Sequence, residues 1–317
     1  MLRWIAVAFA THIFTWGSAF AEDSPHAMHA LAAESESFED GLLRLAKGHD
    51  PSLALVATAG SAVAQVRVGQ FSCTGFAISK TRVMTNQHCV KEQYWNLPRD
   101  PNKADDFDAS ACSMMTVRFG FQTANTELRT TYQYAPPPAI DVRCKKILLA
   151  NMFHDVAIVE LVSELPEAIV PLQLDAEFVP DRRNILHIGH PGGQPKRLFT
   201  NNIASTSAQS CNAIPLQFAG GQGPDGDQHP WHDAKNTHSF VHSCAGPGGS
   251  SGSPILDVLN MHVVGIHWND SADCSWGHFA DRSTPGARLD SRINQYFLPG
   301  SRAISMREIL LFLAITP

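Results

Sequence analysis

The sequence predicts an all-β protein built as an antiparallel barrel or sandwich. From about residue 63 onward, short runs rich in Val, Ile and Phe alternate with Gly, Pro, Asn and Asp, a pattern typical of antiparallel strands. Apolar residues make up 44% of the 317 positions, which is enough for a packed core. In chain order, the expected strands are AVAQVRV, CTGFAIS, RVMTN, MMTVRFGF, DVRCKKILL, VAIVEL, NILHIGH, SPILDV and HVVGIHW.

The first 21 residues have the features of a secretion signal. Arg3 precedes an apolar stretch of about a dozen residues, and Ala-Phe-Ala at positions 19–21 forms a small-x-small cleavage site. The stretch is shorter than the ~20 apolar residues that a membrane span needs. We therefore expect a secreted protein, extracellular or periplasmic, without stable insertion into a membrane.

The segments around the strand-rich region have a different texture. Residues 22–58 contain one helix-like stretch that begins after Ser37 and ends at Gly48, and they form either a pro-segment or an N-terminal arm. The stretch SRINQYFL at 291–298 predicts a short C-terminal helix. The tail at 299–317 ends in about ten apolar residues, too few to cross a bilayer, and folds as a helix or a strand. Two polar stretches, 91–111 and 219–237, are expected to be surface insertions.

Charge and spacing exclude several functions. The formal net charge is -6 and no run of Lys or Arg is present, so nucleic acid is not an expected partner. No C-x-x-C pair occurs, and the Asp-Gly-Asp stretch at 225–227 lacks the acidic alternation of a calcium loop. We therefore expect no metal and no cofactor, and we assign no metal site to the irregularly spaced group His229, His232, His238 and His242.

Seven cysteines in an exported chain favour disulfides and leave one thiol over. Cys73 lies 16 residues before Cys89, across a strand and a turn, so these two are expected to pair. Cys112 and Cys144 flank an insertion between two strand-like runs and can staple it.

The stretch GPGGSSGSPIL at 246–256 is a candidate nucleophile loop. Acyl transfer needs a nucleophile, an imidazole base, an orienting carboxylate and amide donors. His88, in TNQHCV, follows a strand-like run, and Asp155 opens the apolar run VAIVEL, where a half-buried carboxylate needs a partner. Taken singly, His88 can equally be a structural histidine and Asp155 a turn residue.

Taken together, these segments resemble a known family. CTGFAISKTRVMTNQHCV, HDVAIVEL and GGSSGSPIL, in this order, resemble the trypsin-like serine peptidases, whose fold is a chymotrypsin-like double antiparallel β-barrel. SSGSP followed by VVGIHW, together with IGHPGGQPKRL, is similar to the bacterial branch that contains the glutamyl endopeptidases. The resemblance implies a peptidase domain over residues 59–298, with two barrels that meet near residues 170–184.

The resemblance also implies a function and a site. It implies a secreted serine endopeptidase that acts on proteins or peptides through an acyl-enzyme, with Ser251 as nucleophile, His88 as base and Asp155 as orienting carboxylate. The N–H groups of Gly249 and Ser251 would form the oxyanion hole. Ser250 stands where trypsin-type zymogens carry an Asp, so their N-terminal insertion switch is not expected. The alternative is a catalytically silent member used for binding or adhesion, and the oligomeric state stays open.

The expected specificity pocket matches the family only in part. Ala245 stands where Lys- and Arg-specific relatives have an Asp, and Gly246 stands where glutamyl endopeptidases have a hydroxyl residue. His267, in GIHW, matches the glutamyl pocket, and its neighbour Trp268 is also expected to bind substrate. Gly286 matches a wall position where glycine leaves the pocket open. A preference for Glu is therefore one reading and is not established by these residues.

The resemblance implies one further disulfide. Cys211 and Cys244 resemble a pair that brackets the approach to the nucleophile, which would leave Cys274 free. Pairing of Cys244 with Cys274 is the alternative.

Overall fold

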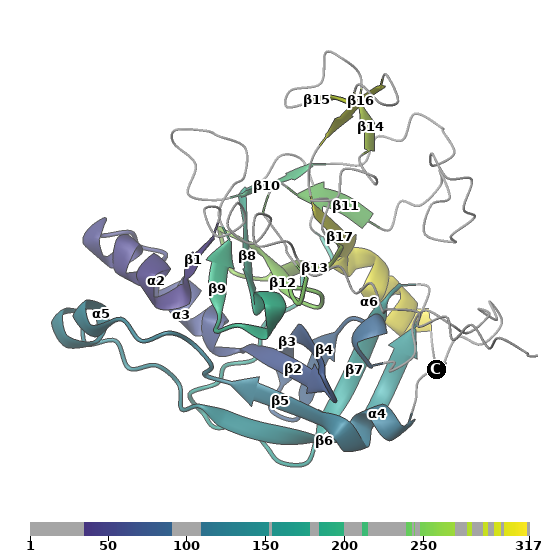
Figure 1. Cartoon of the computed structure of the whole chain (residues 1–317), viewed down its shortest axis with the longest axis horizontal. Helices are drawn as coiled ribbons and strands as arrows, with labels where there is room; N and C mark the ends of the chain where they lie inside the picture. Colours follow the sequence, from purple (N-terminus) through teal and green to yellow (C-terminus); the bar gives the residue numbers. More distant parts are fainter. Residues whose placement is uncertain are drawn as a thin grey trace, which may run out of the picture.

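The structure is a computed structural model, and it describes residues 35–90, 109–151, 154–177, 184–199, 211–214, 239–242, 244, 248–269, 278–280, 288–290, 295–298 and 301–315. Two antiparallel β-structures form its centre (Figure 1). All nine of the apolar runs form strands within a few residues of the expected limits, so the all-β class is confirmed.

The first β-structure is a closed barrel of six strands in the order β2-β3-β4-β7-β6-β5. Side chains of β5 alternate between buried and half-buried, as expected for a strand with one face in the core. Strands β2 and β3 form an antiparallel pair from Val63 opposite Phe76 to Val68 opposite Phe71. The barrel strands are β2 (Val63–Val68), β3 (Phe71–Ser79), β4 (Arg82–Thr85), β5 (Met115–Phe119), β6 (Ile140–Asn151) and β7 (Val156–Leu161).

The second β-structure is a sheet of eight strands in the order β1-β9-β8-β10-β11-β17-β13-β12. Because β12 also pairs with β8, this sheet curls back on itself, in keeping with the double-barrel architecture that we expected. Its strands are β1 (Ser35–Ser37), β8 (Asn184–Gly189), β9 (Arg197–Phe199), β10 (Cys211–Ile214), β11 (Ser239–His242), β12 (Pro254–Asp257), β13 (Val263–Asn269) and β17 (Ser301–Ser305). A separate sheet contains β14 (His278–Ala280), β15 (Arg288–Asp290) and β16 (Gln295–Leu298).

The helix expected at 291–298 is wrong. Gln295–Leu298 is strand β16, which pairs with both β14 and β15, and its Tyr and Phe are residues that favour strands. The C-terminal helix of the fold lies further on, as α6 (Met306–Ile315). Strand β17, just before it, pairs with β11 and β13, so the tail contains both a strand and a helix.

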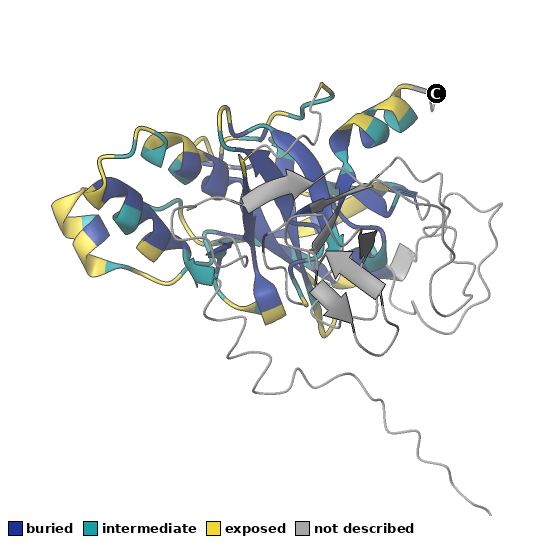
Figure 2. Cartoon of the chain, turned by 90° about the horizontal axis from the view of Figure 1, so that it is seen from above, coloured by how far each residue is buried: buried dark blue, intermediate teal, exposed yellow. Residues whose placement is uncertain are grey.

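The N-terminal segment packs against the strands. Helix α2 (Phe38–Lys47) begins after Ser37, whose side chain accepts the Asp40 N–H at 3.2 Å, and ends at Gly48. Helix α3 (Leu53–Ser61) follows, and β1 extends the second sheet by pairing with β9. Figure 2 shows both helices exposed on their outer faces and buried toward the strands.

The remaining elements are short. They are the helices α4 (Ala109–Met114) and α5 (Thr126–Thr131) and the 3₁₀ turns η1 (His88–Val90) and η2 (Pro191–Gly193). Among the helices that the structure describes, none has the length and apolar character to cross a membrane. Residues 1–21 and 219–237, with the expected signal and second insertion, lie outside the described residues, as do 91–108 of the first insertion.

Two disulfides have the expected pairing, Cys73 with Cys89 and Cys112 with Cys144. Cys244 is also disulfide-bonded. Its partner is not among the described side chains, which exclude those of Cys211 and Cys274, so the choice between these two stays a prediction.

Candidate active site

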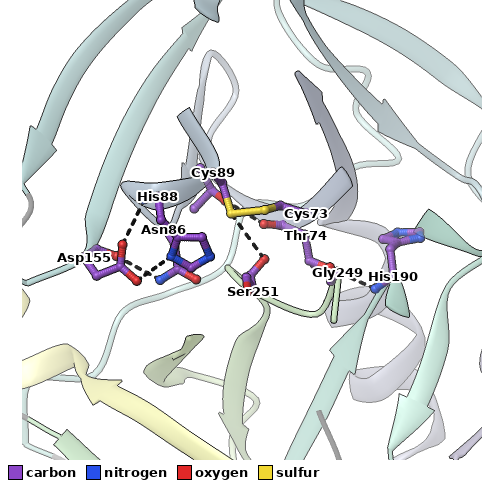
Figure 3. The surroundings of a disulfide bond; sticks show 10 residues. Cys73, Thr74, Asn86, His88, Cys89, Asp155, His190, Gly249 and Ser251 are labelled. Atoms are coloured by element: carbon purple, nitrogen blue, oxygen red, sulfur yellow. Dashed lines mark hydrogen bonds and ion pairs between the residues drawn. A yellow bond between two sulfur atoms is a disulfide. The ribbon is translucent and has the colours of Figure 1, made fainter. Parts of the chain in front are cut away.

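His88 and Asp155 form a close pair in the first barrel. The ring Nδ1 of His88 lies 2.8 Å from Oδ2 of Asp155, and the backbone N–H of His88 donates to Oδ1 at 2.9 Å (Figure 3). An ionised carboxylate only accepts hydrogen bonds, so the Nδ1 atom carries the ring proton and donates a hydrogen bond to Asp155. This tautomer leaves Nε2 of His88 with a lone pair, as a general base requires.

The barrel brings the two residues together. His88 opens η1, three residues after the end of β4, and Asp155 immediately precedes β7. Thr85 of β4 is paired with Ala157 of β7, so the segments beyond these strand ends are neighbours. Asp155 has a φ of +44°, a conformation that Asp tolerates better than most residues. Its carbonyl accepts the side-chain amide of Asn86 at 2.8 Å, which holds this turn.

The electrostatics suit a base that works near neutral pH. Burial disfavours a charged imidazole, but the charge of Asp155 and its hydrogen bond to the ring outweigh this effect and raise the pKa of His88. The Asp155 side chain is 5% exposed and the His88 side chain 24% exposed. The carboxylate is thus shielded from water, while one side of the imidazole stays accessible.

Only one of the three serines in the glycine-rich loop is accessible. Ser250 and Ser253 are fully buried, whereas Ser251 is half-buried. In Figure 3 the His88 ring lies between Asp155 and Ser251. The disulfide supports this arrangement, because Cys89 Sγ lies 3.9 Å from the Ser251 carbonyl oxygen and Cys73 precedes Thr74, whose N–H donates to that oxygen at 2.8 Å.

The backbone of the loop requires glycine at two positions. Gly249 and Gly252 have φ values of +87° and +86°, which side chains disfavour. A Cβ on Gly249 would lie 2.6 Å from the Gly192 nitrogen, and one on Gly252 would overlap the Thr74 carbonyl oxygen. Within the described part of the chain, the N–H groups of Gly249 and Ser251 make no hydrogen bond, so both can serve an oxyanion.

The expected pocket residues are described only in part. His267 lies on β13 and is 1% exposed, and its Nδ1 lies 3.2 Å from Nε2 of His242. The next residue, Trp268, is half-buried. The other expected pocket residues, Ala245, Gly246 and Gly286, lie outside the described residues.

One cluster of potential metal ligands lies beside the site, but its chemistry does not suit a metal. Among the described residues, Cys73, His88 and Cys89 cluster as potential ligands. The two sulfurs are joined in a disulfide and are not the thiolates that bind metals, and His88 is bonded to Asp155. His242, from the irregularly spaced histidine group, faces His267. The other three members of that group, His229, His232 and His238, lie outside the described residues.

Sequence reasoning missed three residues that contact the site. Asn86 holds the Asp155 turn, Thr74 bonds to both Gly249 and Ser251, and His190 bonds to Thr74. Each lies in a segment that carried the family resemblance. No spacing rule assigns them a role, because their contacts join elements more than 60 residues apart.

Comparisons with known proteins give one family and several similar structures. The model of the family described as trypsin-like peptidase domain matches residues 73–266. The active form of the Rv3671c protease from M. tuberculosis is 21% identical, with a TM-score of 0.47, over 84% of this chain and 86% of that chain. A Glu endopeptidase in complex with MPD is 14% identical, with a TM-score of 0.42, over 81% of this chain and 91% of that chain.

A scabies mite inactivated protease paralogue is also similar. It is 13% identical, with a TM-score of 0.45, over 81% of this chain and 92% of that chain. Among curated proteins, none matches the sequence significantly.

Proposed function

Because the chain belongs to the family of trypsin-like peptidase domains, we propose that it is a secreted serine endopeptidase. Ser251 attacks the carbonyl carbon of the substrate, and Nε2 of His88 accepts the hydroxyl proton. The tetrahedral intermediate collapses to an acyl-enzyme when His88 donates this proton to the leaving amine. Water then repeats the cycle and releases the acyl product.

Asp155 and the loop glycines assist both halves of the reaction. Asp155 holds the His88 tautomer and stabilises the imidazolium that forms at each proton transfer. The N–H groups of Gly249 and Ser251 donate to the oxyanion, where such donors lower the barrier most. No cofactor is needed for this chemistry.

The observation that carries the proposal is the accessible Ser251 in a loop beside a histidine with a fixed tautomer. Both oxygens of Asp155 are bonded to His88, and the neighbouring hydroxyls of Ser250 and Ser253 are fully buried. Of the three serines in the loop, Ser251 is therefore the one whose hydroxyl is best placed to attack a peptide substrate.

A fluorophosphonate probe tests this function. We expect the protein recovered from the culture medium to be labelled, Ser251→Ala to abolish labelling, and the matched variant Ser253→Ala to retain it. A folded wild-type protein that stays unlabelled, with its N-terminus trimmed or not, would favour a silent fold used for binding.

We propose that residues 35–58 remain in the mature enzyme as an arm. Phe38, Leu42 and Val56 are fully buried and β1 pairs with β9, so removal of this segment would expose part of the core. Mass spectrometry of the active, secreted form should place its N-terminus between residue 22 and Ser35. An active form that begins after Ser61 would show instead that the segment is a removable pro-segment.

Cleavage of a peptide library tests the substrate preference. We propose that His267 contacts the substrate residue on the N-terminal side of the cleaved bond, so a preference for Glu at that position should weaken in His267→Val. A preference for bulky apolar residues that is unchanged in His267→Val would instead favour selection at the wall position that the family resemblance assigns to Gly286.

A further inference from the structure

Four consecutive peptide units of the nucleophile loop are each held by a donor to their carbonyl oxygen. The Gly192 N–H donates to Gly248 O at 2.6 Å, and the Thr74 hydroxyl donates to Gly249 O at 3.0 Å. The Ser253 N–H donates to Ser250 O at 2.9 Å, and the Thr74 N–H donates to Ser251 O at 2.8 Å. The donors come from β3 of the first barrel, from the turn η2 and from the loop itself.

Because each peptide unit is planar, a hydrogen bond that fixes its C=O also fixes the direction of its N–H. In a trans peptide the C=O and the following N–H point in opposite directions, and the chain has no cis peptide bond among the described residues. The bond to Gly248 O therefore aims the Gly249 N–H away from η2, and the bond to Ser250 O likewise aims the Ser251 N–H. The unit between them, whose oxygen is Gly249 O, depends on Thr74.

Thr74 is the residue that joins these restraints. Its hydroxyl oxygen accepts the His190 N–H at 2.9 Å, so its single proton is directed to Gly249 O. Its carbonyl oxygen accepts the Thr85 hydroxyl at 2.7 Å, and its N–H bonds to Ser251 O. Thr74 is fully buried, so water cannot replace any of these partners.

We infer that the Thr74 hydroxyl is a positioning group for the oxyanion hole, acting through the Gly249–Ser250 peptide unit. Thr74 does not touch the reacting atoms. It fixes the peptide unit between the two donors and ties that unit to the His190 backbone, next to the η2 turn that holds Gly248 O. The inference rests on the proposed serine peptidase function and names a further residue for the same reaction.

The proposal predicts that loss of the hydroxyl weakens stabilisation of the transition state and leaves substrate binding nearly unchanged. Thr74→Val has the same shape but leaves His190 N–H and Gly249 O without a partner, so the peptide unit can rotate. Removal of an oxyanion donor itself lowers kcat by about 10²–10³-fold, and an indirect effect should be smaller. We expect kcat to fall by about 10- to 100-fold with KM changed less than about twofold.

The kinetic experiment uses full-length secreted protein, with rates normalised by active-site titration. Thr74→Ser keeps the hydroxyl and should retain kcat within about threefold. The matched control is Ser61→Ala. Ser61 Oγ also donates to a backbone carbonyl, that of Thr58 at 2.7 Å, and accepts a backbone N–H, that of Val170 at 3.3 Å. This control should lose stability but keep kcat.

Two further readouts separate positioning from a general loss of structure. The affinity of a peptide boronic acid, which mimics the tetrahedral intermediate, should fall in Thr74→Val by the same factor as kcat/KM. The acid limb of the kcat/KM pH profile should not move, because the His88 to Asp155 bond is intact. If Thr74→Val does not fold, Thr74→Ala removes the same hydroxyl and is judged by the same criteria.

The outcomes are distinct. The inference is overturned if the variant lacking the hydroxyl keeps kcat within twofold, if Thr74→Ser is as impaired as Thr74→Val, or if boronate affinity is unchanged. A wild-type protein with neither labelling nor turnover overturns the proposed function, and this inference with it. An active wild type with an unaffected Thr74→Val overturns only the inference.

Discussion

His88 forms hydrogen bonds with both carboxylate oxygens of Asp155. The backbone N–H of His88 bonds to Oδ1 at 2.9 Å and its ring Nδ1 bonds to Oδ2 at 2.8 Å. The carboxylate thus fixes the position of the main chain and the orientation of the ring at once. A change in Asp155 should therefore alter the tautomer of His88.

The first prediction concerns Asp155→Asn. An amide can still accept the His88 backbone N–H, so we expect the fold to be retained. The amide NH₂ would donate to Nδ1 and place the ring proton on Nε2, where it blocks general-base catalysis. We expect kcat to fall by about 10⁴-fold, measured on a peptide ester or amide with circular dichroism as the control for folding. A loss of only a few fold would mean that another carboxylate orients the histidine.

The second prediction concerns the pH dependence of the wild type. His88 acts as a base only when neutral, and Asp155 raises its pKa above the ordinary value of 6.5. Raising this pKa moves the acid limb of the rate to higher pH, so kcat/KM should fall as the pH drops through a value above 6.5. The profile of kcat/KM from pH 5 to 9 measures this limb. A limb at or below pH 6 would contradict the proposed ion pair.

The strands were predictable because each one is a short apolar run bounded by residues that favour turns. The prediction of a helix at 291–298 was wrong because pairing with neighbouring strands, and not local sequence, sets the conformation of this segment. Gln295–Leu298 pairs with a strand on each side, and a stretch of four residues is too short for local periodicity to separate helix from strand.

The site was predictable to the extent that its chemistry needs particular residue types. His88, Asp155 and Ser251 stand in recognisable segments, whereas Thr74 carries no chemical signature. Its role depends on contacts with Gly249 and His190, which lie 175 and 116 residues away. Contacts at such separations arise from the packing of the two β-structures against each other and leave no local pattern.

The third prediction compares two glycines with left-handed backbones. Gly69 has a φ of +58° and open space where a Cβ would lie, whereas Gly249 has a φ of +87° and a Cβ would lie 2.6 Å from the Gly192 nitrogen. Gly69→Ala pays only the backbone cost, about 1–2 kcal/mol. In Gly249→Ala the new methyl group must in addition push η2 and the Gly249 backbone apart, which moves a backbone N–H of the oxyanion hole.

We therefore expect Gly69→Ala to keep full kcat after correction for folded protein, and Gly249→Ala to lose at least about 10²-fold. Urea unfolding measures the stability of each variant, and active-site titration gives the fraction that is competent. Equal kcat in the two variants would mean that the Gly249 backbone does not shape the hole.

The last prediction concerns a buried lysine beneath the arm. The Lys196 side chain is fully buried. Its Nζ donates to the carbonyl of Gly60 and lies 5.2 Å from the centre of the Phe38 ring. Burial disfavours the charged amine and lowers its pKa to about 7 from 10.5, although the nearby Glu39 charge opposes this shift.

The sign of the effect on stability follows from proton binding. Between pH 7 and 10.5 the unfolded chain holds a proton on Lys196 that the folded protein has lost, so the free energy of unfolding should rise with pH across this window. Lys196→Met removes the proton site and should flatten the rise. We expect the difference in unfolding free energy between pH 7 and pH 10 to shrink by about 3.5 kcal/mol.

Urea unfolding at intervals across this range measures the slope. Lys145→Met is the matched control, because the Lys145 side chain is 59% exposed and paired with Glu160 at the surface, so it should leave the slope unchanged. The Gly60 carbonyl loses its donor in Lys196→Met at every pH, which shifts the whole curve without altering its slope. Parallel curves for Lys196→Met and the wild type would show instead that Lys196 keeps its proton on folding.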